Sequence, residues 1–372
     1  MPARRAVPHS AVEASGRVAG LDVLRALAVL AVMARHYLTS GLVAAGWVGV
    51  DLFFVISGYL ITSILLDTKG TPQWRSRFYV RRILRIWPLY YSVLAVLIWT
   101  ASNHRNLAGR EWAYWLHLSN WSMGLQPEHD PPDQFVPLWS LAVEEQFYLL
   151  WPWVVARLKQ ATLVRLCVAL VGLSFLFRVG LVLAGTSPTT VYMLTPDRLD
   201  GLALGALLAL VVRGPSGSER AYRLGWVALL LTTPALVAIV YYQRGLPWDT
   251  GLSLSLGILL VSVVFMALLA VTHGGRSIPT GGPARVLSAI GVRSYGLYLM
   301  HQPVAVGLAA LALHLPLHAF SVVAAVCSYI VAAVSWRYFE SPILRLKALV
   351  PYGNECGDTI LAVTQGRAGP GE

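Results

Sequence analysis

Residues 46–67 read GWVGVDLFFVISGYLITSILLD, an apolar run whose only charged residue before its last position is Asp51. A helix needs about 20 such residues to cross the hydrocarbon core of a bilayer. The whole chain has a similar character, with 56% hydrophobic and only 13% charged residues, against roughly 25% charged residues in a soluble domain. Because isolated strands cannot satisfy their backbone groups in lipid, the sequence predicts an all-α polytopic membrane protein.

Apolar runs of comparable length recur along the chain, separated by polar segments or by glycine and proline. We predict about ten transmembrane helices within a membrane domain at 21–345, after a polar N-terminal segment at 1–20 and before a flexible C-terminal tail at 346–372. The predicted spans are 21–40, 46–67, 84–102, 138–157, 162–184, 199–213, 224–243, 251–272, 286–312 and 318–340.

Lys and Arg concentrate in alternate connections, as the positive-inside rule requires. The tract from Lys69 to Arg85 holds six of them, whereas the turn at 39–46 holds none. This pattern places both termini in the cytoplasm. It also accounts for the net charge of +11, so we expect no nucleic-acid partner.

The first predicted span carries Asp22, Arg25, Arg35 and His36. Arg25 and His36 are separated by three helical turns plus roughly 20°, so they share one face about 16 Å apart along the axis. Ionisable groups in hydrocarbon are costly and mark functional sites, which makes Arg25 and His36 candidates for one polar groove. The alternative is a local Asp22–Arg25 pair and a histidine that only packs.

Two further segments carry candidate binding residues. Arg81, Arg82 and Arg85 lie where the third span leaves the cytoplasm, and arginine forks bind phosphates bidentately. Topology control or anionic lipid binding explains the same arginines. In the second span, Asp51 lies near the outer end, Gly58 permits close helix packing, and Ser57 is expected to be a small packing residue.

The fourth span places two neighbouring carboxylates, Glu144 and Glu145, in an apolar run. Neighbours on a helix point about 100° apart, so one of them is expected to face the bundle interior. A buried carboxylate there is a candidate to orient a histidine, and a structural salt bridge is the alternative. Weaker candidates for supporting roles are Arg198, Tyr298 and His301.

Two other features receive more limited interpretations. The long connection at 103–137 is rich in tryptophan, which is typical of membrane-interface anchors. A lid that gathers the acceptor is the alternative. Metal-ligand spacing is missing from the three cysteines, so we predict no metal site.

Taken in order, these segments resemble the acyltransferase-3 family of membrane acyltransferases. Arg25 and His36, with ten residues between them, match the signature of its first span. The stretches at 49–59, 78–88, 139–148 and 294–303 and the triplet at 340–342 resemble its later motifs. The resemblance extends over nearly the whole predicted membrane domain.

The resemblance implies an enzyme that takes an acyl group, expected to be acetyl, from acyl-CoA as a co-substrate without holding a permanent cofactor. Its catalytic residues map onto His36, Glu144 and Arg25, and its CoA-binding arginines onto Arg81, Arg82 and Arg85. Asp51, Ser57, Arg198, Tyr298 and His301 map onto supporting positions.

The acceptor implied is a hydroxyl on a macrolide-type antibiotic or other glycosylated metabolite, and the alternative is a cell-envelope saccharide. Some members carry a further esterase-like domain, for which the segment after Tyr352 is too short. The composition suggests a bacterium with GC-rich DNA, so we expect a multi-pass protein of the bacterial inner membrane.

Two hypotheses that assign the chain to other functional classes remain open. A transporter or flippase without covalent chemistry would also line its path with polar residues. A purely structural membrane protein explains the apolar composition, but it does not explain the charges inside the spans.

Overall fold

The computed structural model describes residues 9–38, 41–101, 107, 109–129, 131–274, 282–311 and 315–352, and all regular structure within them is helical. The predicted all-α class is therefore confirmed. The elements are α1 (His9–Tyr37), η1 (Gly41–Trp47), α2 (Val48–Thr68), α3 (Trp74–Thr100), α4 (Glu111–Trp115), α5 (Ser119–Leu125), η2 (Asp133–Phe135), α6 (Leu138–Arg157), α7 (Gln160–Leu183), α8 (Pro188–Met193), α9 (Thr195–Val212), α10 (Gly217–Gln243), η3 (Ser253–Gly257), α11 (Ile258–Gly274), α12 (Pro283–Val292), α13 (Ser294–Ala310), α14 (Leu317–Ser335), η4 (Trp336–Glu340), α15 (Ser341–Arg345) and η5 (Leu346–Leu349).

Six stretches of the described chain are long and apolar enough to cross a membrane. They are Val43–Thr68, Trp74–Thr100, Gln160–Leu183, Gly217–Gln243, Ser253–Thr272 and Leu317–Leu349. The remaining predicted spans fall on α1, α6, α9 and the α12–α13 pair, which carry ionisable residues or are shorter. The count of about ten and the cytoplasmic termini stay predictions.

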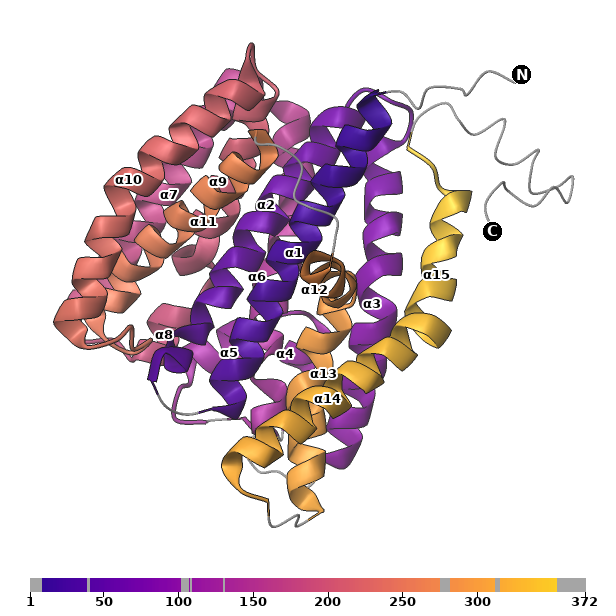
Figure 1. Cartoon of the computed structure of the whole chain (residues 1–372), viewed down its shortest axis with the longest axis vertical. Coiled ribbons are helices and arrows are strands. Elements are labelled where there is room, and N and C mark those ends of the chain that lie inside the picture. Colours follow the sequence, from indigo (N-terminus) through magenta and orange to yellow (C-terminus); the bar gives the residue numbers. More distant parts are fainter. Residues whose placement is uncertain are drawn as a thin grey trace, which may run out of the picture.

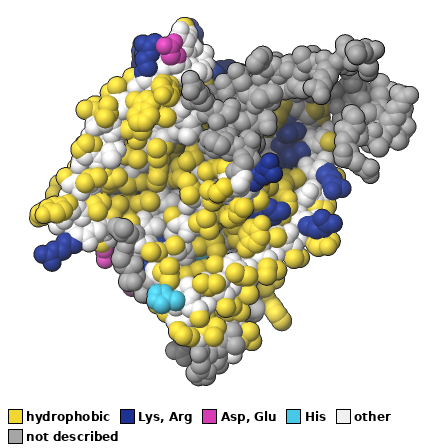
Figure 2. Space-filling model, viewed as in Figure 1, with side chains coloured by type: hydrophobic (Ala, Val, Ile, Leu, Met, Phe, Trp, Pro, Cys, Tyr) yellow, Lys and Arg dark blue, Asp and Glu magenta, His cyan; other side chains and the backbone are white. Residues whose placement is uncertain are grey.

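In Figure 1, α1, α2 and α6 lie in the middle of the bundle, α7, α9, α10 and α11 on one side of them, and α3, α13, α14 and α15 on the other. α2 packs against both α1 and α9, and α7, α10 and α11 pack against α9. The outward faces of α7, α10 and α14 expose large apolar side chains such as Leu176, Leu230 and Val326. Figure 2 shows hydrophobic side chains covering much of one face of the bundle, as expected where lipid is the solvent.

The contact between α2 and α9 depends on two glycines. A Cβ atom at Gly58 would lie 2.0 Å from the carbonyl oxygen of Leu202, and one at Gly205 would lie 2.0 Å from that of Val55. Each helix therefore presents a glycine to the backbone of the other. The close approach expected at Gly58 is confirmed, and it is typical of small-residue packing in membranes.

Some helices differ in their bounds from the spans predicted on them. α3 begins at Trp74, ten residues before the predicted start at 84, because its arginines are accommodated inside the helix. The run at 286–312 divides at Arg293 into α12 and α13. A Cβ atom at Gly291 would lie 1.8 Å from the carbonyl oxygen of Asp22, so packing of α12 against α1 redirects the chain.

The long connection between α3 and α6 contains α4, α5 and η2. Gln146 of α6 fastens it, because its amide donates to the carbonyl oxygen of His117 at 2.8 Å and to Asn120 Oδ1 at 2.9 Å. Its carbonyl oxygen accepts from Trp121 at 3.2 Å. Trp112 is 57% exposed, in keeping with the anchor interpretation.

The C-terminal segment is folded further than predicted. Arg81 donates from NH1 to the carbonyl oxygens of Lys347 and Val350, each at 2.9 Å, and its guanidinium lies 4.4 Å from the ring centre of Tyr352. Residues 346–352, the start of the predicted flexible tail, thus dock on α3. Positions 353–372, and 1–8 of the N-terminal segment, lie outside the described residues.

Candidate active site

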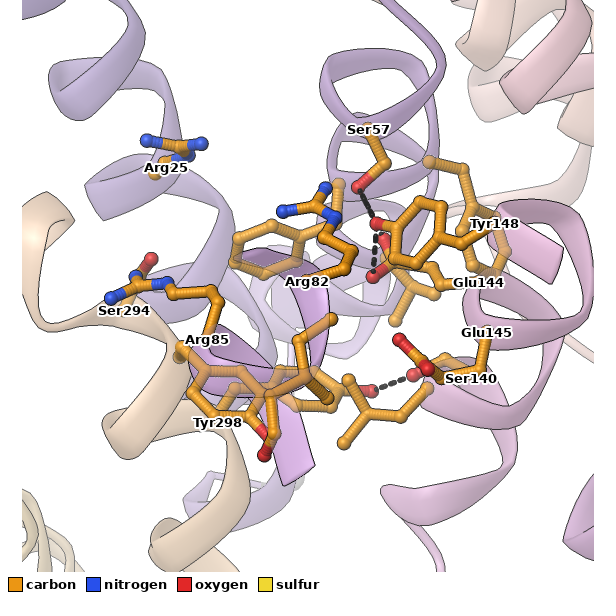
Figure 3. A pocket seen from close by; sticks show the side chains of 16 residues that line it. Arg25, Ser57, Arg82, Arg85, Ser140, Glu144, Glu145, Tyr148, Ser294 and Tyr298 are labelled. Atoms are coloured by element: carbon orange, nitrogen blue, oxygen red, sulfur yellow. Dashed lines mark hydrogen bonds between the residues drawn. The ribbon is translucent and has the colours of Figure 1, made fainter. Parts of the chain in front are cut away.

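A first cavity, which we call the arginine cavity, lies between α1, α2, α3, α6 and α13 and has a volume of about 100 Å³. Figure 3 shows Arg25 and Arg85 on one side of it, a polar group from α2 and α6 on the other, and Arg82 between them. Its lining residues are Arg25, Val50, Phe53, Phe54, Ser57, Arg82, Arg85, Ile86, Ser140, Leu141, Glu144, Glu145, Tyr148, Ser294, Tyr295 and Tyr298.

A second cavity, the histidine cavity, has a volume of about 190 Å³ and contains His36. Its walls are mostly aromatic and apolar. The lining residues are Val32, Arg35, His36, Trp47, Val50, Val136, Pro137, Trp139, Tyr192, Met193, Trp248 and Tyr298.

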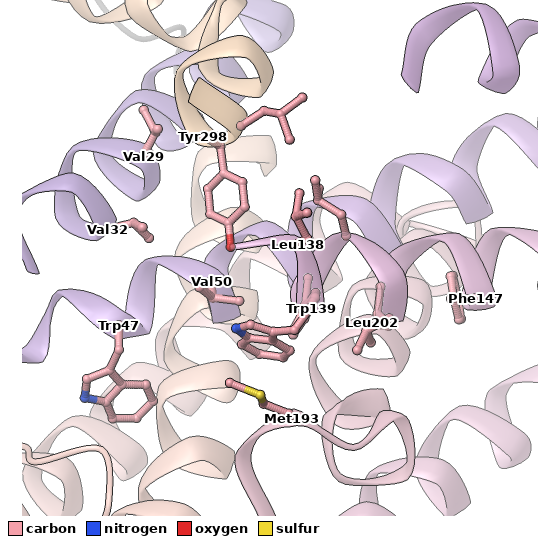
Figure 4. Close-up of a cluster of buried hydrophobic side chains, with 14 of the residues drawn as sticks. Val29, Val32, Trp47, Val50, Leu138, Trp139, Phe147, Met193, Leu202 and Tyr298 are labelled. Atoms are coloured by element: carbon pink, nitrogen blue, oxygen red, sulfur yellow. The ribbon is translucent and has the colours of Figure 1, made fainter. Parts of the chain in front are cut away.

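Val50 and Tyr298 line both cavities, so the two spaces adjoin across these side chains. Figure 4 shows Tyr298 pointing toward Val50 and Trp139. Its hydroxyl lies 2.6 Å from Ser140 Oγ, and its ring meets that of Phe53 edge to face at 5.7 Å. Arg25 and His36 therefore face the same interior but lie in separate cavities, and Arg25 also pairs with Asp22 at 3.2 Å, the local pair named as the alternative.

His36 is held by a second histidine. Its Nδ1 lies 2.9 Å from Nε2 of His301, and His301 Nδ1 lies 2.7 Å from the carbonyl oxygen of Tyr298. A carbonyl only accepts, so a neutral His301 carries its proton on Nδ1 and accepts through Nε2. His36 then donates from Nδ1, which leaves its Nε2 as the basic lone pair, with no bonding partner among the described residues.

Glu144 forms hydrogen bonds with Ser57 and Tyr148, and His36 is not among its hydrogen-bond partners within the described residues. Ser57 donates to one of its oxygens at 2.6 Å, and the Tyr148 hydroxyl lies 3.0 Å from the other oxygen and 2.9 Å from Ser57 Oγ. The structure therefore does not bring Glu144 to His36, and the catalytic role expected for Glu144 stays a prediction. His301, predicted only as a supporting residue, lies beside His36 instead.

Glu145 is the neighbour of Glu144, and the sequence predicted no catalytic role for it. It lines the arginine cavity beside Glu144, and Trp87 donates to one of its oxygens at 3.1 Å. Its other oxygen is buried and has no hydrogen-bond partner among the described residues. Both neighbouring carboxylates thus reach the cavity, because the cavity wraps around this face of α6.

The three predicted phosphate-binding arginines separate into two groups. Arg82 and Arg85 line the arginine cavity together with Arg25. Their guanidinium groups are placed by aromatic rings: Arg82 lies 4.4 Å from the ring centre of Tyr148, and Arg85 lies 5.4 Å from that of Trp336. Arg81 is not among the lining residues and instead binds the segment after α15.

Asp51 and Arg198 form a buried ion pair at 2.6 Å and line neither cavity. The Arg198 guanidinium lies 4.8 Å from the ring centre of Tyr192 and 5.8 Å from that of Trp139, and both rings line the histidine cavity. The pair therefore supports an aromatic wall of that cavity.

A second buried pair was missed. Arg178 of α7 binds Asp200 at 2.6 Å, and both side chains are at most 1% exposed. The available signal was Arg178, which stands in the apolar interior of the run 162–184, whereas the other arginine of that run, Arg165, lies near its start. Within the described chain, no group of three or more His, Cys, Asp or Glu is close enough to hold a metal ion.

Comparison with known proteins bears directly on this arrangement. The chain is 31% identical over 352 residues to the peptidoglycan O-acetyltransferase OatA of Listeria monocytogenes, and the match covers 88% of this chain and 56% of that protein. It is 32% identical over 356 residues to the putative peptidoglycan O-acetyltransferase YrhL of Bacillus subtilis, covering 88% of this chain and 55% of that protein.

A third relative is the O-acetyltransferase OatA of Staphylococcus aureus, 30% identical over 354 residues, with 87% of this chain and 57% of that protein covered. The chain thus spans little more than half the length of these relatives. No solved structure shows a significant match. The family described as the acyltransferase domain matches residues 18–337, nearly all of the helical bundle, and the chain therefore belongs to this acyltransferase-3 family.

Proposed function

We propose that the chain is a membrane O-acyltransferase that moves an acyl group from acyl-CoA to a hydroxyl of a cell-envelope saccharide. The observation that carries the proposal is the pair of adjoining cavities, one lined by three arginines and the other by a histidine with a free basic nitrogen. A thioester donor and a hydroxyl acceptor would approach from opposite sides and meet near Tyr298.

The arginine cavity suits the donor. Coenzyme A carries several phosphates, and guanidinium groups pair with phosphate through charge-assisted hydrogen bonds. Arg25, Arg82 and Arg85 come from two helices and face one space. The Nε of Arg82 is buried without a hydrogen-bond partner among the described residues. The cavity is too small for a whole CoA molecule, so the thioester arm would enter it while the phosphates stay at its arginine-lined mouth.

The histidine cavity suits the chemistry. His36 Nε2 would take the proton of the acceptor hydroxyl as the oxygen attacks the thioester carbonyl carbon. The new C–O bond forms, the C–S bond breaks, and the proton passes from His36 to the departing CoA thiolate. General-base assistance of this kind contributes roughly 10²–10⁴-fold to the rate.

Arg25 and Arg35 are the cations of α1 that line the two cavities. A cation near the reacting carbonyl stabilises the negative charge that develops on its oxygen. Arg35 is next to His36 and lines the same cavity, which makes it the better candidate for this role. We therefore assign Arg25 to donor binding.

The names of the relatives support one class of acceptor. Two of them are named for peptidoglycan O-acetylation, which favours an envelope saccharide over the macrolide-type acceptor expected first. All three come from bacteria, so we propose the bacterial cytoplasmic membrane as the location. Acetyl is the proposed acyl group because all three relatives are named as O-acetyltransferases.

The proposal is tested with membranes that contain the chain, acetyl-CoA labelled in its acetyl group, and a panel of hydroxylated saccharides. An acyltransferase moves the label to the saccharide in a ratio of one to each free CoA released. A transporter moves material across the membrane without forming labelled ester, and that result would replace the proposal. Membranes with the His36→Gln variant at equal abundance are the control.

A further inference from the structure

A third hollow lies on the lipid-facing side of the bundle, between α10, α11 and the junction of η1 with α2. Its volume is about 960 Å³, the largest of the cavities described here. It is lined by Ala45, Val48, Leu236, Val240, Tyr241, Tyr242, Arg244, Gly245, Leu246, Val261, Val264 and Phe265. We call it the α10–α11 groove.

The groove and the histidine cavity share a wall. Ala45 and Val48 line the groove, whereas Trp47 between them lines the histidine cavity. The Trp47 indole N–H donates to the carbonyl oxygen of Leu246 at 2.9 Å, and Leu246 itself lines the groove. Trp47 and its hydrogen bond to Leu246 are thus part of the wall between the groove and the cavity that contains His36.

The side chains that line the groove carry one charge, on Arg244. This residue ends α10 with a left-handed φ of 55° and is exposed. Within the described part of the chain its guanidinium has no acidic partner. The groove therefore combines a long apolar surface with one cation at its end, which is the complement of an anionic amphiphile: apolar tail in the groove, phosphate at the arginine.

We propose that the α10–α11 groove binds the hydrocarbon tail of a phosphate-linked saccharide lipid, and that this lipid is the acyl acceptor. Arg244 binds its phosphate. The saccharide then extends past Trp47 and Leu246 into the histidine cavity, where a hydroxyl meets His36. This inference rests on the proposed function and names the form in which the acceptor arrives.

The position of the groove supports this occupant over a freely soluble saccharide. A soluble acceptor needs only an aqueous opening into the histidine cavity, and it has no use for an apolar groove beside it. An ordinary phospholipid would fit the tail and the arginine but carries no saccharide. The experiment separates these occupants.

The probe is a polyprenyl-pyrophosphate-linked disaccharide, compared with the same headgroup on a short water-soluble prenyl chain. Initial rates of labelled acetyl transfer are measured on purified protein in nanodiscs of zwitterionic lipid. Wild type should have a KM for the long-chain acceptor at least about tenfold below that for the short-chain one, since tail burial contributes to binding.

The groove is then blocked with Val264→Trp, and Val237→Trp is the matched control. Val237 lies on α10, is 60% exposed and does not line the groove. Val264→Trp should remove the advantage of the long chain and leave the KM for acetyl-CoA and for the short-chain acceptor unchanged. Val237→Trp should behave as wild type.

The phosphate contact is tested with Arg244→Gln, a surface change that does not threaten folding, against Arg220→Gln near the other end of α10. Loss of a charge-assisted bond should raise the KM of the phosphate-linked acceptor about tenfold only at position 244. Equal KM values for long and short chains in wild type, or equal behaviour of the paired variants, would overturn the inference and indicate a soluble acceptor or an ordinary bound phospholipid. Absence of labelled product with every acceptor would instead reject the proposed function.

Discussion

His36 Nδ1 and His301 Nε2 lie 2.9 Å apart although 265 positions separate them in the chain. His301 is fully buried, and the Tyr37 hydroxyl donates to its carbonyl oxygen at 2.8 Å. His301 thus fixes both the ring orientation and the tautomer of His36. This relationship gives the candidate base its free nitrogen, and the first two predictions follow from it.

Replacing His36 with Gln should lower kcat for acetyl transfer by about 10²–10⁴-fold, because the acceptor hydroxyl loses its base. Folding should persist, since the side chain is only partly buried and Gln can still donate to His301. The measurement is transfer of labelled acetyl at equal protein abundance. His318→Gln, at an exposed position of α14, is the matched control. Undiminished turnover in the His36 variant would remove it from the active site.

Replacing His301 with Leu should lower kcat by about 10–100-fold, because His36 loses the acceptor that holds its proton on Nδ1. The KM for acetyl-CoA should not change. His301→Gln should recover part of the loss, since its carbonyl oxygen can accept the same hydrogen bond. If Leu and Gln variants show the same kcat, His301 serves only packing.

Arg85→Ala should raise the KM for acetyl-CoA about tenfold, the effect of losing one charge-assisted phosphate contact. Arg81→Ala should leave this KM near wild type, because Arg81 binds backbone carbonyls of the segment after α15. With an acetyl-pantetheine donor, which lacks the phosphates, wild type and Arg85→Ala should have similar KM values. If both variants raise the KM for acetyl-CoA equally, the assignment of Arg85 but not Arg81 to phosphate binding is wrong.

Arg198→Met should destabilise the protein by about 3–5 kcal/mol, because it leaves the Asp51 carboxylate buried without its partner. The double variant Asp51→Asn with Arg198→Met should recover much of that loss. Unfolding in detergent by denaturant provides the measurement. A double variant no more stable than the single one would mean that the Arg198 contacts with Tyr192 and Trp139 outweigh the ion pair.

Much of the fold followed from local patterns. The apolar runs predicted helices at the right places, because span length and hydrophobicity are properties of consecutive residues. The interruption at Arg293 and the early start of α3 were not predictable in this way. The interruption arises from the contact of Gly291 with the backbone of Asp22. The early start of α3 arises because arginines near its start pack against aromatic rings.

Sequence alone determined that this chain is helical, that lipid surrounds it, and that Arg25 and His36 share one helix face, since helical period and transfer into lipid depend on residue type and spacing. Tertiary structure decided which groups meet. It placed His301 rather than Glu144 beside His36, turned Arg81 away from the arginine cavity, and put Trp47 between that histidine and a lipid-facing groove. Such pairings join residues on different helices, so they depend on how the helices pack rather than on any spacing along the chain.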